Sequence, residues 1–273
     1  MIHITMDPIL AQWGPFTLSW HGLWLAAGVL AFYLLLVREG KQRGFDRESL
    51  SELALWILVA GLAGARLFHV VQEWRVYAAE PLRILAVYEG GLTVNGAVCG
   101  AVAAAVLFAR RKGFSFWRLA DAMVMAAPLA FVVGRVGCTI NGDVPGLPTN
   151  GSWGLVYTHP HAFLPAAWLG IPTFPAPAVL QLWNLGLFLL LRFLRDRVPA
   201  DGFLAAIYLG VYGLGRFVTN IWQAGEVAAL GLKYIQLMAL GLILLGAVLA
   251  VYLQFGRPVA PRSHWHDLNR EVR

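Results

Sequence analysis

Charged residues are scarce in this chain of 273 residues, and that scarcity argues against a typical soluble domain. Asp, Glu, Lys and Arg make up 13% of the sequence, against about 25% in soluble domains, while hydrophobic residues reach 59%. Cysteine is scarcer still. The chain has only Cys99 and Cys138, which are too few for a disulfide scaffold. Cys99 falls inside an apolar run, so a bridge to Cys138 would need close helix contact and is not expected.

Positive charge is missing from particular segments. Residues 1–15 and 138–175 contain no Lys or Arg. Because the first of these segments lacks a basic start, and no small-residue cleavage site follows the first apolar run, we expect no cleavable signal peptide. The sequence also shows no internal repeat or low-complexity tract, which indicates a single domain over residues 1–273.

Long apolar runs are what the sequence has in abundance. Seven of them are about 20 residues long, the length that crosses the hydrocarbon core of a bilayer. They predict membrane spans at roughly 16–37, 51–71, 90–109, 117–137, 176–194, 203–222 and 234–254. A soluble protein with a large buried core is the alternative, and seven such runs disfavour it. The sequence therefore predicts an all-α integral membrane protein with one transmembrane domain.

The basic residues predict how these spans are oriented. Three of them fall inside spans and three in the connections on one side of the membrane. The other fifteen belong to the opposite side, in 38–49, 110–118, 192–202 and the tail after 254. The positive-inside rule then places the N-terminus outside and the C-terminus in the cytoplasm, with 138–175 as the largest external loop. The net charge of +6 is therefore a topology signal and requires no nucleic-acid partner.

Two further patterns concern packing and the membrane surface. Small residues recur four positions apart inside spans, and such pairs let helices approach closely. They are Gly61 with Ala65, and Gly96 with Gly100. In the external loop, Trp153, Tyr157 and Trp168 are expected to lie at the membrane interface.

Arg135 is the residue that most needs an explanation. It follows the apolar run 123–133, where an unpaired guanidinium is costly unless an anion binds it. The glycines and prolines of 134–149 are expected to end the helix there and to free backbone N–H groups beside the charge. A cation next to free N–H groups suits a phosphate.

Polar groups from five spans are expected at one depth. Counted along each helix, Arg66, Arg135 and Arg216 all lie within roughly 10 Å of the outer interface. His21 and Asn95 reach a similar depth. The alternative is that each arginine simply extends its side chain to the membrane surface. A shared level, beside external loops with almost no basic residues, favours one anion-binding site.

Spacing within the spans supports this interpretation. The side chains of Tyr212, Arg216, Asn220 and Gln223 form a polar stripe on one helix face. Asp121 lies about four turns from Arg135, too far to neutralise it, and is expected to cap or pair near the cytoplasmic end. Candidates to neutralise the outer arginines are a phospholipid head or one of the carboxylates Glu89, Asp143 and Glu226.

At this point the sequence resembles a known family, the bacterial prolipoprotein diacylglyceryl transferases. The segment GRVGCTINGDVPGLPT at 134–149 is similar to the family signature. Matching pieces occur in order along the chain, from the first span to the last. They include EGGLTVNG at 89–96, WGLVYTHP at 153–160 and YGLGRF at 212–217.

The resemblance implies an enzyme of the bacterial cytoplasmic (inner) membrane. Such an enzyme moves the diacylglyceryl group of phosphatidylglycerol to the lipobox cysteine in the signal peptide of a prolipoprotein. It would need no metal or other cofactor, would have membrane lipid as its other partner, and is expected to act as a monomer.

The resemblance also implies roles for individual residues. Arg135 and Arg216 would be catalytic through the phosphate of the donor lipid, and Asp143 would act as the tentative base. Asn141 and Gly142 would shape the site. Together with the polar residues that share its depth or its helix face, the predicted phospholipid-binding residues are Arg135, Arg66, Arg216, Asn141, Gly142, Asn95, His21 and Tyr212.

This chain is a divergent member, because several polar positions of the family pattern carry other residues. Asn95 replaces a common His, His21 a common Tyr, Cys138 a common Asn, and Asp143 a common Glu. The segment 174–180 lacks the family's His, Tyr and Glu, and Asn220 and Gln223 follow Arg216 in place of Glu and Arg.

The sequence thus leaves the general base open between Asp143, His21 and His159. Cys138 can be interpreted as a nucleophile or, more simply, as a small packing residue. An inactive phospholipid-binding paralogue or scaffold is the alternative function. A transporter would need midplane polar groups and paired half-repeats, which the sequence does not show.

Overall fold

Seven helices dominate the computed structural model, which describes residues 1–14, 16–86 and 90–255. Each of the seven is long and apolar enough to cross a membrane. They are α1 (Trp20–Gln42), α2 (Arg47–Gln72), α4 (Val94–Lys112), α5 (Phe116–Asn141), α6 (Ala176–Leu194), α7 (Phe203–Thr219) and α8 (Tyr234–Phe255). The expected all-α multi-pass membrane protein is confirmed.

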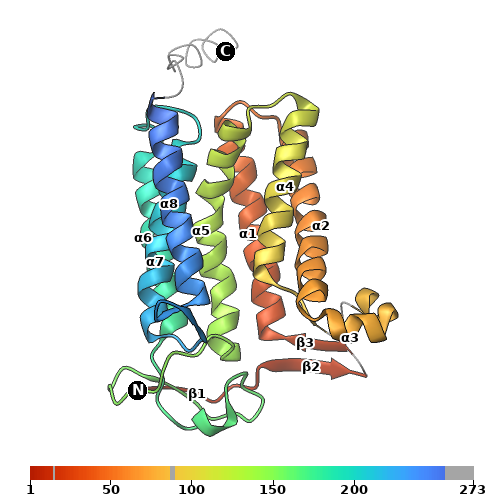
Figure 1. Cartoon of the computed structure of the whole chain (residues 1–273), viewed down its shortest axis with the longest axis vertical. Helices are drawn as coiled ribbons and strands as arrows, with labels where there is room; N and C mark the ends of the chain where they lie inside the picture. The colour runs from red at the N-terminus through yellow and green to blue at the C-terminus, as the bar shows by residue number, and fades with distance from the viewer. Residues whose placement is uncertain (15, 87–89, 256–273) are drawn as a thin grey trace.

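Short strands gather at the end of the bundle where the chain begins, which we call the N-terminal end (Figure 1). Strand β1 (Ile2–Ile4) pairs in parallel with β4 (Leu155–Tyr157), so the start of the chain is joined to the loop after α5. Two hairpins accompany this pair. They are β2 (Ile9–Trp13) with β3 (Phe16–Ser19), and β5 (Val227–Ala229) with β6 (Leu232–Lys233). The short helix α3 (Trp74–Ala79) follows α2.

Helix α5 lies at the centre of the bundle (Figure 1). It packs along α1 on one side and against α6 and α7 on the other. On the outer flanks, α2 pairs with α4 and α8 packs on α7. Because α5 touches both halves, a residue on α5 can meet groups from α1 and from α7.

Small residues make the α2–α4 contact possible. A Cβ atom added at Gly64, Gly96 or Gly100 would overlap a backbone carbonyl oxygen of the facing helix. Ala65 is buried at the same interface, and Gly61 is in ordinary contact with Ala97. The packing role expected for the small-residue pairs of these two spans is therefore confirmed.

The helix that carries Arg135 does not end where the sequence predicted. Helix α5 continues through Gly134 and Gly137 and ends at Asn141, with Gly142 in the left-handed conformation as its cap (φ 75°). Gly137 serves packing instead, because a Cβ there would lie 2.8 Å from His21 Cα of α1. A helix C-terminus also leaves carbonyl groups free rather than N–H groups. The prediction of free helical N–H groups beside Arg135 was therefore wrong.

Buried acidic residues organise the opposite end of the bundle, which we call the basic end. Glu39 is 2% exposed and pairs with Arg43, Arg192 and Arg195 at 3.3, 3.0 and 3.6 Å, which ties α1 to α6. Asp121 of α5 accepts hydrogen bonds from the first backbone N–H groups at α7, those of Gly202 and Ala205, at 2.9 and 3.0 Å. The capping role expected for Asp121 at this end is confirmed.

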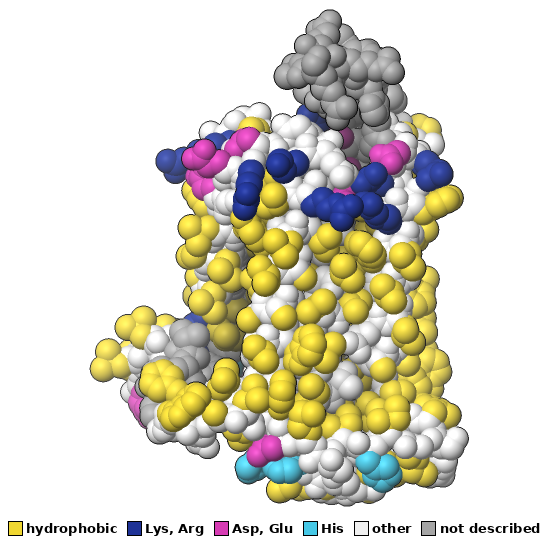
Figure 2. All heavy atoms as spheres, turned by 180° about the vertical axis from the view of Figure 1, so that it is seen from behind, with side chains coloured by type: hydrophobic (Ala, Val, Ile, Leu, Met, Phe, Trp, Pro, Cys, Tyr) yellow, Lys and Arg dark blue, Asp and Glu magenta, His cyan; other side chains and the backbone are white. Residues whose placement is uncertain are grey.

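The outer surface matches a lipid environment. Large apolar side chains lie exposed along the spans, and in Figure 2 they cover the middle of the molecule while Lys and Arg gather towards the basic end. The first span begins at Trp20 rather than at residue 16, because residues Phe16–Ser19 form β3 and Ser19 Oγ caps α1 by accepting from Gly22 N. One interfacial aromatic was predicted wrongly, since Tyr157 in β4 is 1% exposed.

Candidate functional site

Two arginines from different helices meet at the N-terminal end. Arg135 of α5 lies over the ring of Phe131 at 5.2 Å, and that ring packs edge-on against Tyr212 of α7 at 5.7 Å. Arg216, one turn beyond Tyr212, is near enough to Arg135 for their charges to interact. Among the described residues, no partner hydrogen-bonds Nη1 of either guanidinium, although both nitrogens are buried.

This arrangement is electrostatically unusual. Two like charges repel each other, and burial removes the water that would otherwise stabilise them. Buried donors without an acceptor are rare in proteins, and each one calls for an explanation such as an ordered water or an ion. An anion that can accept from both arginines, as a phosphate does, would suit this arrangement.

An acid–base group lies beside this pair. Asp143, the second residue after α5, places Oδ2 3.4 Å from Nδ1 of His21 on α1. The same His21 nitrogen is 3.8 Å from Sγ of Cys138. Asp143 Oδ1 is buried and has no hydrogen-bond partner in the described part of the chain. Carboxylate, imidazole and thiol thus face one another from α1, α5 and the following loop.

The backbone conformation at Gly142 explains why Asp143 lies beside the end of α5. Gly142 adopts a positive φ, which a residue with a Cβ adopts rarely, and a Cβ here would lie 3.2 Å from the ring of Tyr157. The Tyr157 hydroxyl donates to the carbonyl of Thr139 at 2.9 Å. Burial raises the pKa of Tyr157, so its hydroxyl stays protonated and keeps this bond.

Close packing and backbone contacts also fix the start of α1. Gly137 lets α5 approach α1 at His21, and the Ser19 cap and the β2–β3 hairpin fix where α1 begins. The backbone N–H of Trp20 donates to the carbonyl of Pro8 at 3.0 Å. The β2–β3 hairpin, the Ser19 cap and the contact with α5 therefore fix the position of His21. Its distance from Asp143 follows from that position.

Arg66 is placed differently from the other two intramembrane arginines. It is 7% exposed, and all of its N–H groups are used by backbone carbonyls of the segment after α3, with Tyr77 below its guanidinium at 5.1 Å. The acceptors are the carbonyl oxygens of Arg83, Ile84, Ala86, Gly90 and Gly91. No N–H group remains for a phosphate, so the structure gives Arg66 the task of ordering this segment. A cavity of about 200 Å³ lies beside it, lined also by His69.

The remaining predicted lipid-binding residues are spread over the N-terminal end. Tyr212 lies within the arginine cluster, stacked on Tyr208 at 5.4 Å. Asn141 ends α5, and its carbonyl accepts from Phe163 N at 2.8 Å. Asn95 is exposed on α4, where its amide donates to Met238 Sδ of α8 at 3.7 Å. The structure thus brings Tyr212 to the arginines and places Asn95 at a contact between α4 and α8.

Three further candidates for acid–base or neutralising roles were named from the sequence. His159 faces Asp7 and His161 rather than the arginines. Glu226 is exposed, and Glu89 lies outside the described residues. Asp143 and His21 are therefore the two base candidates that the structure places together.

Sequence reasoning missed several members of the site. Phe131 precedes Arg135 by four residues and so lies on the same helix face, a spacing that signals the contact. Trp24, one turn after His21, has a buried Nε1 without a hydrogen-bond partner among the described residues. Tyr157 was expected at the membrane interface instead, because only the fold shows that its loop returns beneath Gly142.

The ligand atoms of His21, Cys138 and Asp143 also lie within 4.8 Å of one another and could hold a metal ion. The nearby cationic Arg135 opposes a dication there, since it already acts electrostatically on Cys138. The residues therefore favour anion binding beside a carboxylate and an imidazole.

Known proteins resemble this chain over most of its length. Residues 8–252 match the family model described as prolipoprotein diacylglyceryl transferase. The chain is similar to proteins named phosphatidylglycerol–prolipoprotein diacylglyceryl transferase in several bacteria. That of Synechococcus elongatus is 33% identical over 90% of this chain and 87% of its own length. Those of Gloeobacter violaceus and Bacillus anthracis are 34% and 30% identical, over 88% and 90% of this chain and 90% and 92% of their own lengths.

Proposed function

The chain belongs to the prolipoprotein diacylglyceryl transferase family, and we propose that it transfers the diacylglyceryl group of phosphatidylglycerol to the lipobox cysteine of prolipoproteins. It would do so as a monomer in the bacterial cytoplasmic membrane, with the N-terminal end of the bundle on the outer side. The basic end would then face the cytoplasm, in keeping with the positive-inside rule.

The observation that carries this proposal is the pair of buried guanidinium nitrogens on Arg135 and Arg216, for which the described residues provide no acceptor. A phosphodiester carries one negative charge and two free oxygens, so it can accept from both arginines. The surrounding side chains, Phe131 and Tyr212, keep water away and strengthen these charge-assisted bonds.

The same arginines would act in the reaction as well as in binding. The cysteine sulfur of the prolipoprotein attacks the carbon of the diacylglyceryl group that bears the phosphate. A C–S bond forms, and the bond between that carbon and the phosphate oxygen breaks. The electron pair of the broken bond passes to the departing glycerol phosphate, whose charge rises from one to two. Two fixed cations stabilise this growing charge more than they stabilise the intact lipid, which is how they accelerate the step.

Asp143 would receive the thiol proton. A cysteine thiol has an ordinary pKa of about 8.5, so at neutral pH it needs a base to become a nucleophile. His21 engages Oδ2 of Asp143, which leaves the buried Oδ1 as the free acceptor. His21 is then a positioning residue, and the proton leaves the carboxylate for water after transfer.

The experiment that tests the proposal is complementation of a strain depleted of its own transferase, combined with an assay of transfer from phosphatidylglycerol to a lipobox peptide. Arg135→Ala should lower kcat/KM by roughly 10²–10³-fold, as loss of one donor to a developing charge does elsewhere. Arg135→Lys should retain part of the activity, since it keeps the charge and loses the forked geometry.

The matched control is Arg110→Ala, an exposed arginine at the basic end, which should behave as the parent protein. Membrane insertion and expression of every variant would be checked in the same cells. Full transfer by Arg135→Ala, or failure of an inserted parent protein to support growth, would contradict the assignment.

A further inference from the structure

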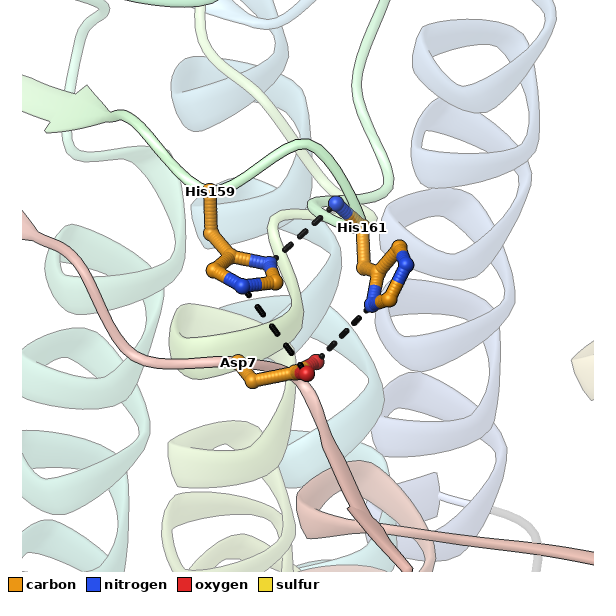
Figure 3. A group of neighbouring side chains, drawn as sticks. All are labelled: Asp7, His159 and His161. Atoms are coloured by element: carbon orange, nitrogen blue, oxygen red, sulfur yellow. Dashed lines mark hydrogen bonds and ion pairs between the residues drawn. The ribbon is translucent and has the colours of Figure 1, made fainter. Parts of the chain in front are cut away.

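A second cluster of ligand-type side chains lies outside the reaction site and has no part in it. It consists of Asp7, in the segment between β1 and β2, and His159 and His161, in the loop after β4. In Figure 3 the two imidazole rings and the carboxylate point toward one another from these two segments. Asp7 Oδ2 is 3.8 Å from His159 Nε2, and Asp7 Oδ1 is 3.2 Å from His161 Nδ1.

These separations suit a divalent transition metal. Ligands at about 2.0–2.2 Å from a tetrahedral zinc ion lie roughly 3.3 Å from each other. All three ligand atoms here lie within 4.8 Å of one another, so small side-chain rotations would complete the geometry. Two imidazoles and one carboxylate form a ligand set that zinc and similar metals favour over calcium or magnesium.

We propose that Asp7, His159 and His161 bind one zinc-type divalent cation, which leaves at least one coordination position open to water. Exposure supports entry from solvent, because His161 keeps 55% of its side chain exposed and Asp7 42%. No membrane-spanning helix contributes a ligand. The site is therefore accessible to aqueous metal ions without passage through the lipid.

Backbone hydrogen bonds orient the Asp7 carboxylate and the His159 ring. The backbone N–H of Ile9 donates to Asp7 Oδ1 at 2.9 Å. This bond holds the carboxylate in place beside the two histidines. His161 N–H donates to His159 Nδ1 at 3.3 Å, which turns Nε2 toward Asp7. When a metal takes Nε2, the ring proton moves to Nδ1 and this weak bond opens.

The metal would act as a clamp between two segments that hold the reaction site. One segment is the N-terminal arm, where Pro8 next to Asp7 accepts from Trp20 N at the start of α1, beside His21. The other segment begins at Tyr157, under Gly142, and reaches Phe163, which donates to the carbonyl of Asn141. Joining them at one ion would limit the separation of α1 from the end of α5.

The test is a zinc titration of the tag-free full chain in detergent against a chromophoric chelator. We expect one zinc per chain, with affinity that falls as pH drops through the histidine range, because protons compete for the same nitrogens. Asp7→Asn and His161→Ala should each weaken zinc binding at least tenfold. His3→Ala, a change on the same arm outside the cluster, should leave it unchanged.

Cobalt distinguishes this cluster from the one at Cys138. Cobalt bound by Asp7, His159 and His161 should show visible bands without a thiolate charge-transfer band, and Cys138→Ser should leave those bands intact. A thiolate band, or zinc binding that Cys138→Ser abolishes and Asp7→Asn spares, would overturn the proposal. So would zinc binding no tighter in the parent than in the Asp7→Asn variant.

Hydrogen exchange provides a second readout that does not depend on transfer activity. Zinc should slow exchange of the backbone amides in 2–10 and 158–164 in the parent protein, and not in His161→Ala. Because His161 is more than half exposed, this variant is expected to fold. Equal exchange with and without saturating zinc in the parent would exclude the clamp.

Discussion

At the scale of single residues, the same side chain serves two purposes according to what its backbone neighbours offer. Arg66 and Arg135 were predicted to lie at one depth, and both guanidiniums are largely withdrawn from water. Backbone carbonyls of 83–86 and 90–91 satisfy Arg66 completely, while Arg135 and Arg216 each keep a nitrogen that has no acceptor in the described part of the chain. Unsatisfied donors, rather than charge or depth alone, separate the two arginines proposed to bind phosphate from the structural one.

Asp143 gives the sharpest prediction at this scale. Asp143→Asn keeps the size and one hydrogen-bond acceptor but removes the base, so kcat should fall by roughly 10²–10⁴-fold. The KM for phosphatidylglycerol should change little, because the arginines are untouched. Asp143→Glu, which restores a carboxylate, should recover part of kcat. Steady-state transfer assays at varied lipid concentration measure both constants, and unchanged kcat in Asp143→Asn would remove the base assignment.

At the scale of elements, close helix pairs fix the positions of the polar groups. The α2–α4 and α1–α5 interfaces are built on glycines whose absent side chains let backbones touch. At α1–α5 this contact is made at Gly137 and His21, so the packing also determines how near His21 comes to Asp143.

The glycine interfaces can be tested with one methyl group. Gly96→Ala would push a Cβ into the Gly64 carbonyl, and overpacking of this kind costs about 1–3 kcal/mol. The melting temperature in detergent should fall. Gly186→Ala in α6 is the control, since a Cβ there meets nothing within 4 Å and alanine favours the helix. If both variants melt alike, the close α2–α4 contact is not important for stability.

At the scale of the whole molecule, the two ends of the bundle have different chemistry. The basic end carries the Glu39 ion-pair network and most of the Lys and Arg residues. The N-terminal end carries the short strands, the arginine pair and the histidine cluster. This asymmetry is what a membrane with a potential and anionic inner lipids selects.

The orientation follows as a prediction. Leu230 is 93% exposed in the turn between β5 and β6, so Leu230→Cys should react with a membrane-impermeant thiol reagent applied to cells from outside. Arg110→Cys, at the basic end, should react only after the cells are opened. The unmodified chain measures any background from Cys99 and Cys138. The reverse labelling pattern would mean that the N-terminal end faces the cytoplasm.

The sequence alone determined the membrane environment, the seven spans and the residues that deserved suspicion. The span at 176–194 coincides with α6, and the others lie within a few residues of the observed helices. The prediction of spans succeeds because a run of about 20 apolar residues is stable in the hydrocarbon core of a bilayer, whatever the rest of the chain does. The position of Asp121 relative to Arg135 was likewise readable, since helical rise is fixed.

Tertiary structure decided which suspected residues meet. Three findings needed the tertiary structure: α5 continues to Asn141, Arg66 donates its hydrogen bonds to backbone carbonyls, and Tyr157 is buried. All three depend on loops that return from elsewhere in the chain. The pairing of His21 with Asp143, and of His159 with Asp7, joins positions more than a hundred residues apart. Periodicity describes one element at a time, whereas distances between elements come from packing that no local pattern encodes.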